Sequence, residues 1–402
     1  MLHELINLRT CLFSEHRIDS AALYDKKLEI IQRNLYGVDI DQFAVNIARL
    51  RLWLSLVVED QRNPLDDPEA QDKVALPNLD LKIEVGDSLM APDPSGGLQP
   101  DLIRRQQIEE FNRLKADYMR AHDLRKAELR REIEAKRAEI AEWAHPGTQV
   151  RGLDWPVEFA EVFADEPGGF DIVLANPPYV RQELIKDLKP ALKCVYGDLY
   201  CGTADLYVYF YIRSLQLLRP GGMLAFILSN KWFRANYGEK LRGHIAETCA
   251  VRSITDFGEL PVFTAATFPM IFIARKSRPG AVGALFTQVK SLEDPYPDVR
   301  ALIERDGHRL PESAFRGANW VLADCTTADR LEKMERAGVP LGEYVNGRIY
   351  YGIKTGFNKA FVIDGAKRAE LIAADPRSEE IIKPLRSVTT YASGASRTAT
   401  DG

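Results

Sequence analysis

Short apolar runs alternate along the chain with stretches in which apolar residues recur every three or four positions. The short runs predict β-strands, and the periodic stretches predict helices. The predicted strands are residues 34–40, 81–87, 170–175, 223–228, 251–257 and 270–274. The predicted helices are residues 1–32, 42–59 and 203–218. This alternation indicates an α/β fold with a Rossmann-like open sheet.

The pattern changes between the second and third predicted strands. Residues 101–148 carry 11 Lys or Arg and 10 Asp or Glu, with sparse apolar residues at helical spacing. This predicts a protruding helical hairpin, residues 97–148, inserted between two strands of the core. Such a hairpin could rest on DNA or on a partner, but the interleaved charges favour a solvated spacer.

The strand predicted at Phe170–Ala175 is rich in β-branched residues and should be buried. Asn176 follows at the carboxyl end of this strand, where open α/β sheets bind their ligands. Pro177 and Pro178 stiffen the turn and have no N–H, so the Asn176 amide and the Pro177 carbonyl are free and aimed the same way. These groups suit a substrate with two N–H hydrogens, such as the exocyclic amine of a nucleobase. Asn and Pro are also ordinary turn residues, so a simple turn is the alternative.

The stretch Asn176 to Tyr179 (NPPY) resembles the catalytic motif of amino methyltransferases that use S-adenosyl-L-methionine (AdoMet). Its surroundings, from about Asn34 to about Pro384, resemble the adenine-specific DNA methyltransferases of restriction–modification and phage-defence systems, particularly the type IIG-like enzymes. The resemblance implies an AdoMet-dependent methyltransferase core that methylates the exocyclic amine (N6) of adenine in double-stranded DNA. It makes Asn176, Pro177, Pro178 and Tyr179 the predicted catalytic residues.

The resemblance also assigns residues to the cofactor. It implies that Asp39 binds the ribose, that Ile40 packs on the adenine ring, and that Asp87 accepts the amino group of that ring. Asn176 and Asp205 match positions near the cofactor and the target base. Without the resemblance, Asp39 could equally be a neighbour of a helix cap and Asp87 an ordinary turn residue.

Two aromatic residues are predicted to contact the flipped target adenine. Tyr179 offers a flat face for stacking. Leu260–Phe263 resembles the loop that places a second aromatic residue against the base, which favours Phe263 over Phe268. Either phenylalanine could instead be a core residue.

Three regions are predicted. Residues 1–278 form the catalytic core, residues 279–343 a connector, and residues 344–402 the truncated start of a DNA target-recognition domain with a disordered tail. The domain assignment rests on Tyr351–Asp364, which resembles the opening of the recognition domain in these enzymes.

The Gly-rich AdoMet loop of these enzymes normally lies on a strand ahead of Asp39, but Gly37 is the first glycine of the chain. The sequence therefore resembles a middle piece of a longer protein. Such a piece is expected to bind AdoMet weakly or not at all, to show no methylation by itself, and to regain activity when the upstream segment is supplied.

Composition adds limits on the class of protein. The chain has 46% hydrophobic residues, 28% charged residues and a net charge of −5, as in soluble globular proteins. We predict a cytoplasmic location, because no apolar run has the length of a membrane span and the N-terminus has no signal region. The five cysteines contain no CxxC pair and the six histidines are scattered, so no metal site is predicted. The negative net charge does not exclude a DNA enzyme, because only its cleft needs to be basic.

Two clusters of basic residues could contact phosphates or form solvated faces. The residues are Arg181, Lys186, Lys189 and Lys193, and then Lys231, Arg234, Lys240 and Arg242.

Two alternatives remain open at this point. One is an NPPY methyltransferase that acts on RNA or on a protein glutamine. The other is an inactive or split-subunit fragment that only binds DNA or a partner chain, such as a restriction or specificity subunit. A nuclease is not predicted, since the sequence shows no metal-binding carboxylate–lysine cluster.

Overall fold

The structure is a computed structural model. It describes residues 20–57, 78–96, 98, 100–146, 152–263, 268–278, 283–293, 298–315, 320, 322, 327, 330, 333–334, 336–348 and 363–383. The chain divides into two compact units, Met1–Asp329 and Arg330–Gly402. No helix in the described ranges combines the length and the apolar character needed to cross a membrane.

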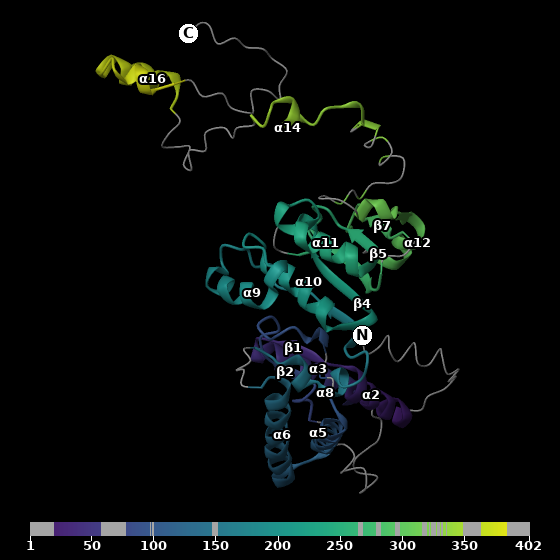
Figure 1. Ribbon diagram of the computed structural model, residues 1–402. Coiled ribbons are helices and arrows are strands. Elements are labelled where there is room, and N and C mark those ends of the chain that lie inside the picture. The colour runs from purple at the N-terminus through teal and green to yellow at the C-terminus, as the bar shows by residue number, and fades with distance from the viewer. Residues whose placement is uncertain are drawn as a thin grey trace. The chain divides into compact units, whose positions relative to one another are not determined.

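A six-stranded mixed sheet forms the centre of the first unit, in the order β3-β4-β6-β5-β7-β8 (Figure 1). Its strands are β3 (Phe170–Ala175), β4 (Leu218–Ser229), β5 (Cys249–Asp256), β6 (Pro269–Lys276), β7 (Leu285–Gln288) and β8 (His308–Arg309). β3 pairs parallel with β4, while β6 runs antiparallel to both β4 and β5. The carboxyl ends of β3, β4 and β5 therefore lie at one edge of the sheet, together with the amino end of β6.

One helix, α10 (Leu206–Leu217), packs its aromatic residues against this sheet. Tyr211 is fully buried, and its ring centroid lies 5.0 Å from that of Phe226 on β4 and 5.7 Å from that of Phe272 on β6. Nine of the twelve residues of α10 are buried, so this helix lies in the core. It lacks the broad polar face that a surface helix turns to the solvent.

Several further elements surround this core. The helices are α7 (Trp155–Glu158), α8 (Ala160–Phe163), α9 (Lys189–Tyr196), α11 (Glu239–Thr248) and α12 (Val299–Asp306). The 3-10 helices are Pro94–Gly96, Lys186–Leu188, Gly197–Leu199, Asn230–Phe233, Asn236–Gly238 and Glu312–Phe315.

A separate two-stranded parallel sheet is formed by β1 (Gly37–Asp39) and β2 (Ile83–Val85). It is accompanied by α2 (Ser20–Asn34) and α3 (Gln42–Val57), and Arg49 of α3 donates from Nε to the Ile83 carbonyl at 3.1 Å. The ring of Tyr36, just before β1, lies 5.5 Å from that of Phe170 at the start of β3. The two sheets therefore share an apolar cluster without sharing a strand.

The burial predicted for β3 is wrong. None of its six residues is buried, and Ile172 and Leu174 are 50% and 48% exposed, whereas Val173 and Ala175 pack against the main core. Alternate side chains point to opposite faces of a strand, so Ile172 and Leu174 share the face that is left exposed. β3 also stands at the edge of the six-stranded sheet, with no strand among the described residues paired to its second edge.

The helical hairpin is confirmed as α5 (Leu102–Arg120) and α6 (Asp123–Ala144), but it is not a solvated spacer. Phe111 and Ile133 are fully buried in a cluster that includes Leu81 and Val157 of the α/β core. The interleaved charges explain the difference, because part of them faces inward and forms ion pairs.

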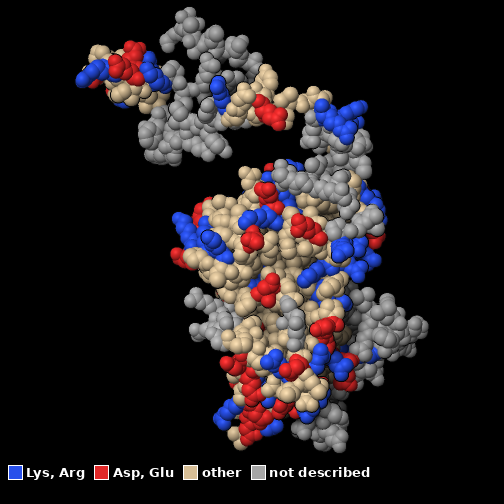
Figure 2. All heavy atoms as spheres, viewed as in Figure 1, with Lys and Arg blue, Asp and Glu red and all other residues tan. Residues whose placement is uncertain are grey.

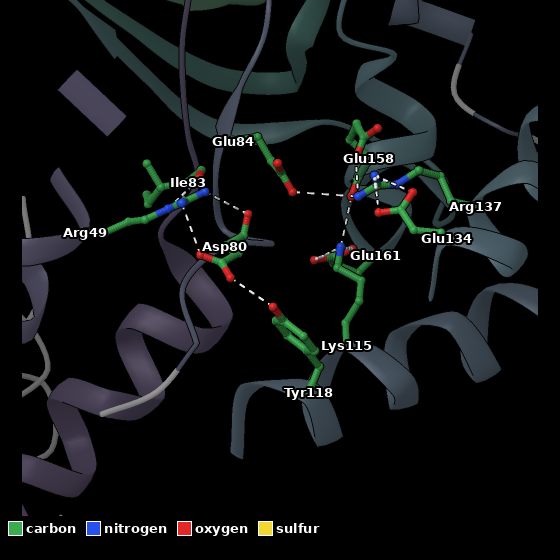
Figure 3. A network of polar contacts seen from close by, with 10 residues as sticks. All are labelled: Arg49, Asp80, Ile83, Glu84, Lys115, Tyr118, Glu134, Arg137, Glu158 and Glu161. Atoms are coloured by element: carbon green, nitrogen blue, oxygen red, sulfur yellow. Dashed lines mark hydrogen bonds and ion pairs between the residues drawn. The ribbon is translucent and has the colours of Figure 1, made fainter. Parts of the chain in front are cut away.

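Figure 3 shows these ion pairs between the hairpin and the core. Lys115 of α5 contacts Glu161 of α8 at 2.9 Å, and Arg137 of α6 contacts Glu158 of α7 at 2.8 Å. Arg137 also lies 3.7 Å from Glu84 of β2. The hairpin is therefore fixed to the core by both apolar and ionic contacts.

The predicted connector contributes to the sheet. β7 pairs parallel with β5, and β8 pairs antiparallel with β7. These strands are only four and two residues long, too short to show an alternating pattern in the sequence.

The second unit contains α14 (Leu341–Tyr344), α16 (Gly365–Ala374) and α17 (Ser378–Ile381). Asp364 caps α16 by accepting from the Lys367 N–H at 2.7 Å. Most of the predicted opening of a recognition domain, residues 351–362, and the predicted tail, residues 387–402, lie outside the described residues.

Candidate active site

Three of the predicted site residues lie at one edge of the six-stranded sheet. Asn176 and Tyr179 follow β3, and Phe263 lies on the segment that follows β5. Because β3, β4 and β5 share a direction, these connections leave the sheet on the same side.

The NPPY turn presents its polar groups outward. Asn176 and Pro178 are exposed, while Pro177 is buried. The Val180 N–H donates to the Pro178 carbonyl at 3.0 Å. Within the described part of the chain, neither the Asn176 amide nor the Pro177 carbonyl has a hydrogen-bond partner. The Asn176 side chain is therefore accessible to a substrate.

Tyr179 is half-buried beside Phe263. Their ring centroids lie 5.9 Å apart, with 57° between the ring planes. Burial raises the pKa of Tyr179 to about 12, so the phenol is neutral at ordinary pH. The two rings form an apolar pair, and Tyr179 is the last residue of the NPPY turn.

Asp205 connects the NPPY segment to α10. It stands at the N-cap of this helix, and its Oδ1 accepts from the Gln182 N–H at 2.9 Å. The Leu206 N–H donates to the Val180 carbonyl at 3.0 Å. These two bonds fix the chain that leaves Tyr179 against the first turn of α10.

The residues predicted to bind a nucleoside lie at the carboxyl ends of β1 and β2. Asp39 Oδ1 accepts from the Asp41 N–H at 2.8 Å, and Asp87 Oδ1 accepts from the Leu89 N–H at 2.8 Å. Ile40 is 73% exposed. The second carboxylate oxygen of each aspartate is without a partner among the residues that the structure describes.

Arg213 links the loop that follows Asp87 to α10, the helix that Asp205 caps. The sequence analysis did not identify this residue. It lies on α10 and is 1% exposed. Its guanidinium donates to the carbonyls of Pro92 at 2.7 Å and Leu89 at 3.0 Å, and also to that of Ala91. The loop after Asp87 is therefore bound to the helix that Asp205 caps. The available signal was a single arginine within an otherwise apolar helix.

The basic clusters are only partly available for phosphate contacts. Arg242 is 2% exposed and donates to the Ala235 and Trp232 carbonyls, so its predicted surface role is wrong. Lys240 donates to the carbonyls of Asp198 and Tyr200. Figure 2 shows Lys and Arg side chains gathered over α9, and the exposed basic residues around this helix are Arg181, Lys186 and Lys193.

No group of three or more His, Cys, Asp or Glu that could hold a metal ion occurs among the described residues.

The chain matches one known protein family and several known proteins. The family described as Eco57I restriction-modification methylase matches residues 33–263, which include every predicted site residue. The chain is 37% identical over 131 residues to the type II methyltransferase M.XhoI of Xanthomonas vasicola, covering 32% of this chain and 24% of the relative. It is 28% identical over 242 residues to the type II methyltransferase M.BstVI of Geobacillus stearothermophilus. This match covers 56% of this chain and 42% of the relative.

Among solved structures, the type IIL restriction-modification enzyme MmeI in complex with DNA is similar over 94% of this chain and 47% of that chain, with 13% identity and a TM-score of 0.40. The chain spans about a quarter to two fifths of the length of the two curated relatives.

Proposed function

Because the chain belongs to the Eco57I restriction-modification methylase family, which matches more than half of its length, we propose that it methylates adenine in DNA at the exocyclic amine, N6. The methyl donor would be AdoMet, and the setting a cytoplasmic restriction–modification or phage-defence system. One observation carries the proposal: the exposed Asn176 and the Pro177 carbonyl, which have no hydrogen-bond partner among the described residues, stand on the same NPPY turn as Tyr179, whose ring lies 5.9 Å from that of Phe263.

The residues present fit the adenosine part of AdoMet. A ribose presents hydroxyl donors and an adenine presents an amine donor, and Asp39 and Asp87 each keep one carboxylate oxygen without a partner among the described residues. The exposed Ile40 offers an apolar surface for the ring. Asp39 would hold the ribose, Asp87 the amine and Ile40 the ring, while Asp205 would lie near both cofactor and target base. When bound, AdoMet supplies an electrophilic methyl group.

The Asn176 amide and the Pro177 carbonyl would act on the amine of the target base. This amine is a poor nucleophile, because its lone pair is delocalised into the ring. If its two hydrogens donate to Asn176 and Pro177, the nitrogen becomes more pyramidal and its lone pair points away from the ring plane. This is preorganised electrostatic stabilisation combined with positioning, on a turn that Pro177 and Pro178 make rigid.

The two aromatic rings would bind the base itself. A base inside a duplex cannot reach the NPPY turn, so it has to leave the stack at a cost of about a few kcal/mol. Stacking on an aromatic ring recovers about 1–3 kcal/mol per base. Tyr179 would stack on the base, and Phe263 would close the pocket from a second side.

The partner would be double-stranded DNA, with residues 344–402 as the start of a target-recognition domain, residues 279–343 as the link to it and residues 1–278 as the catalytic core. The exposed basic residues around α9 could contact the phosphates. A second candidate function is a subunit that binds DNA or a partner chain without catalysis. It is favoured by β3, whose second edge has no paired strand among the described residues and whose Ile172 and Leu174 are half-exposed, so that another segment or chain could cover them.

The test, made with the expected upstream segment supplied, is methyl incorporation from labelled AdoMet into duplex DNA, RNA and a glutamine-containing protein, followed by chromatography of the nucleosides and amino acids. The proposal predicts N6-methyldeoxyadenosine from duplex DNA alone. N4-methyldeoxycytidine, or label in RNA or protein, would contradict it. DNA retention without any incorporation would favour the binding subunit.

A further inference from the structure

Asn230 contacts both ends of the connection between β5 and β6. It directly follows β4. Its Nδ2 donates to Asp256 Oδ1 at 3.0 Å, and its backbone N–H donates to the Phe268 carbonyl at 2.9 Å. Asp256 is the last residue of β5, and Phe268 directly precedes β6.

Asp256 extends this contact to the segment Gly258–Phe263. The same Oδ1 that accepts from Asn230 accepts from the Gly258 N–H at 3.0 Å. Gly258 has a φ of +55°, which glycine adopts without the steric cost that other residues bear. The carboxylate thus fixes the point where the segment turns away from β5.

The segment then stays compact up to its aromatic residue. The Leu260 N–H donates to the Phe257 carbonyl at 3.0 Å, and the Val262 N–H donates to the Leu260 carbonyl at 2.8 Å. Phe263 follows at once, with its ring beside that of Tyr179. A continuous series of hydrogen bonds therefore leads from Asn230 to the ring pair.

We propose that Asn230 and Asp256 are positioning residues that fix the Gly258–Phe263 segment, so that Phe263 closes the base pocket beside Tyr179. This inference rests on the proposed function. Both side chains are half-buried, and Asp256 forms no ion pair with a described residue, so its carboxylate is engaged by the Asn230 amide and the Gly258 N–H. Neither residue is assigned a contact with the base or with AdoMet.

The first measurement is hydrogen–deuterium exchange of the peptide that covers Gly258–Phe263 in the whole protein. Asn230→Ala and Asp256→Ala should each speed its exchange by about 10-fold or more, because a hydrogen bond to a charged group is lost. Peptides from the central strands β4 and β6 should keep their rates. Unchanged exchange of the segment in both variants would overturn the proposal.

A charge swap gives the matched control. Asn230→Asp alone places two carboxylates in contact, so it should disorder the segment at least as much as Asn230→Ala. Combining Asn230→Asp with Asp256→Asn restores one amide and one carboxylate, and an acceptor for the Gly258 N–H remains. The double variant should return the exchange to within about threefold of wild type. If exchange in the double variant is as fast as expected from adding the effects of the two single substitutions, the pair does not act through this hydrogen bond.

The second measurement separates positioning from general stability. With duplex DNA, Asn230→Ala should raise KM for the DNA by about 10-fold, while the affinity for AdoMet stays within about twofold of wild type. An equal loss of AdoMet affinity would overturn the positioning role. Because exchange is measured without methyl transfer, an absence of methylation by the wild-type protein supplied with the expected upstream segment would contradict only the proposed function, and unchanged exchange would contradict only this inference.

Discussion

The ring of Tyr179 lies 5.9 Å from that of Phe263, centroid to centroid, although the two residues come from connections after different strands. The planes are tilted by 57°, so the rings do not stack on one another. We propose that one face of Tyr179 receives the base while Phe263 encloses its side.

The first prediction concerns the effect of replacing the aromatic ring of Tyr179. Tyr179→Ala should weaken the duplex complex by about 1–3 kcal/mol and slow methylation, because the stacking surface is lost. Tyr179→Phe and Tyr179→Trp should be mild, since each keeps a ring face. The hydroxyl has no hydrogen-bond partner within the described residues, which supports the same expectation.

The measurement is the dissociation constant for duplex DNA and the methylation rate of the three variants side by side. If Tyr179→Phe is as damaging as Tyr179→Ala, the hydroxyl is the functional group and the stacking role is wrong.

Much of the α/β core was predictable because each strand has its own local signal. The runs around Val38, Ile83, Val173, Phe226 and Ile254 each contain an observed strand or part of one, although β1 and β2 are shorter than the predicted 34–40 and 81–87. The hairpin was predictable for the same reason, since helical spacing is local.

Burial and long-range polar contacts were not predictable in this way. β3 has the composition of a buried strand, yet Ile172 and Leu174 are half-exposed, because exposure depends on what packs against each face of the strand. The charges of the hairpin look solvated in sequence, but Lys115 and Arg137 pair with glutamates far along the chain. Arg213 is a similar case, since its acceptors lie on a loop more than a hundred residues away.

Arg213 gives the second prediction. Arg213→Met should destabilise the protein by about 3 kcal/mol or more, because it leaves buried carbonyls without donors at about 1–3 kcal/mol each. Arg213→Lys should cost less, since an ammonium can still donate to one or two of them. Urea unfolding measures both. A loss below about 0.5 kcal/mol for Arg213→Met would show that the loop after Asp87 does not depend on this helix.

The third prediction concerns pH and the contact between the hairpin and the core. Glu158 and Glu84 share Arg137, and burial raises the pKa of both carboxyls, that of Glu158 to about 7. A raised pKa means that the folded state binds a proton more tightly than the unfolded state. The stabilisation from Glu158 is therefore complete below its ordinary pKa near 4.5 and is lost as pH rises toward about 7.

The comparison is between wild type and Glu158→Gln, with the free energy of unfolding measured at several pH values between 5 and 8. Wild type should lose stability relative to the variant by at most about 1.4 kcal/mol per pH unit. The effect should level off above the folded pKa. Parallel curves for the two proteins would mean that Glu158 is ionised in the folded state throughout this range.

Asn176 tests the central claim, that the NPPY turn activates the amine of the target base. The measurement is the single-turnover rate of methyl transfer to duplex DNA for wild type and Asn176→Ala, each supplied with the upstream segment that the sequence analysis expects, together with the affinity of each for AdoMet. We predict a loss in rate of about 10²–10³, as for removal of one preorganised polar partner, with AdoMet binding nearly unchanged. Equal weakening of AdoMet binding and of the rate, or an unchanged rate, would contradict this role of Asn176.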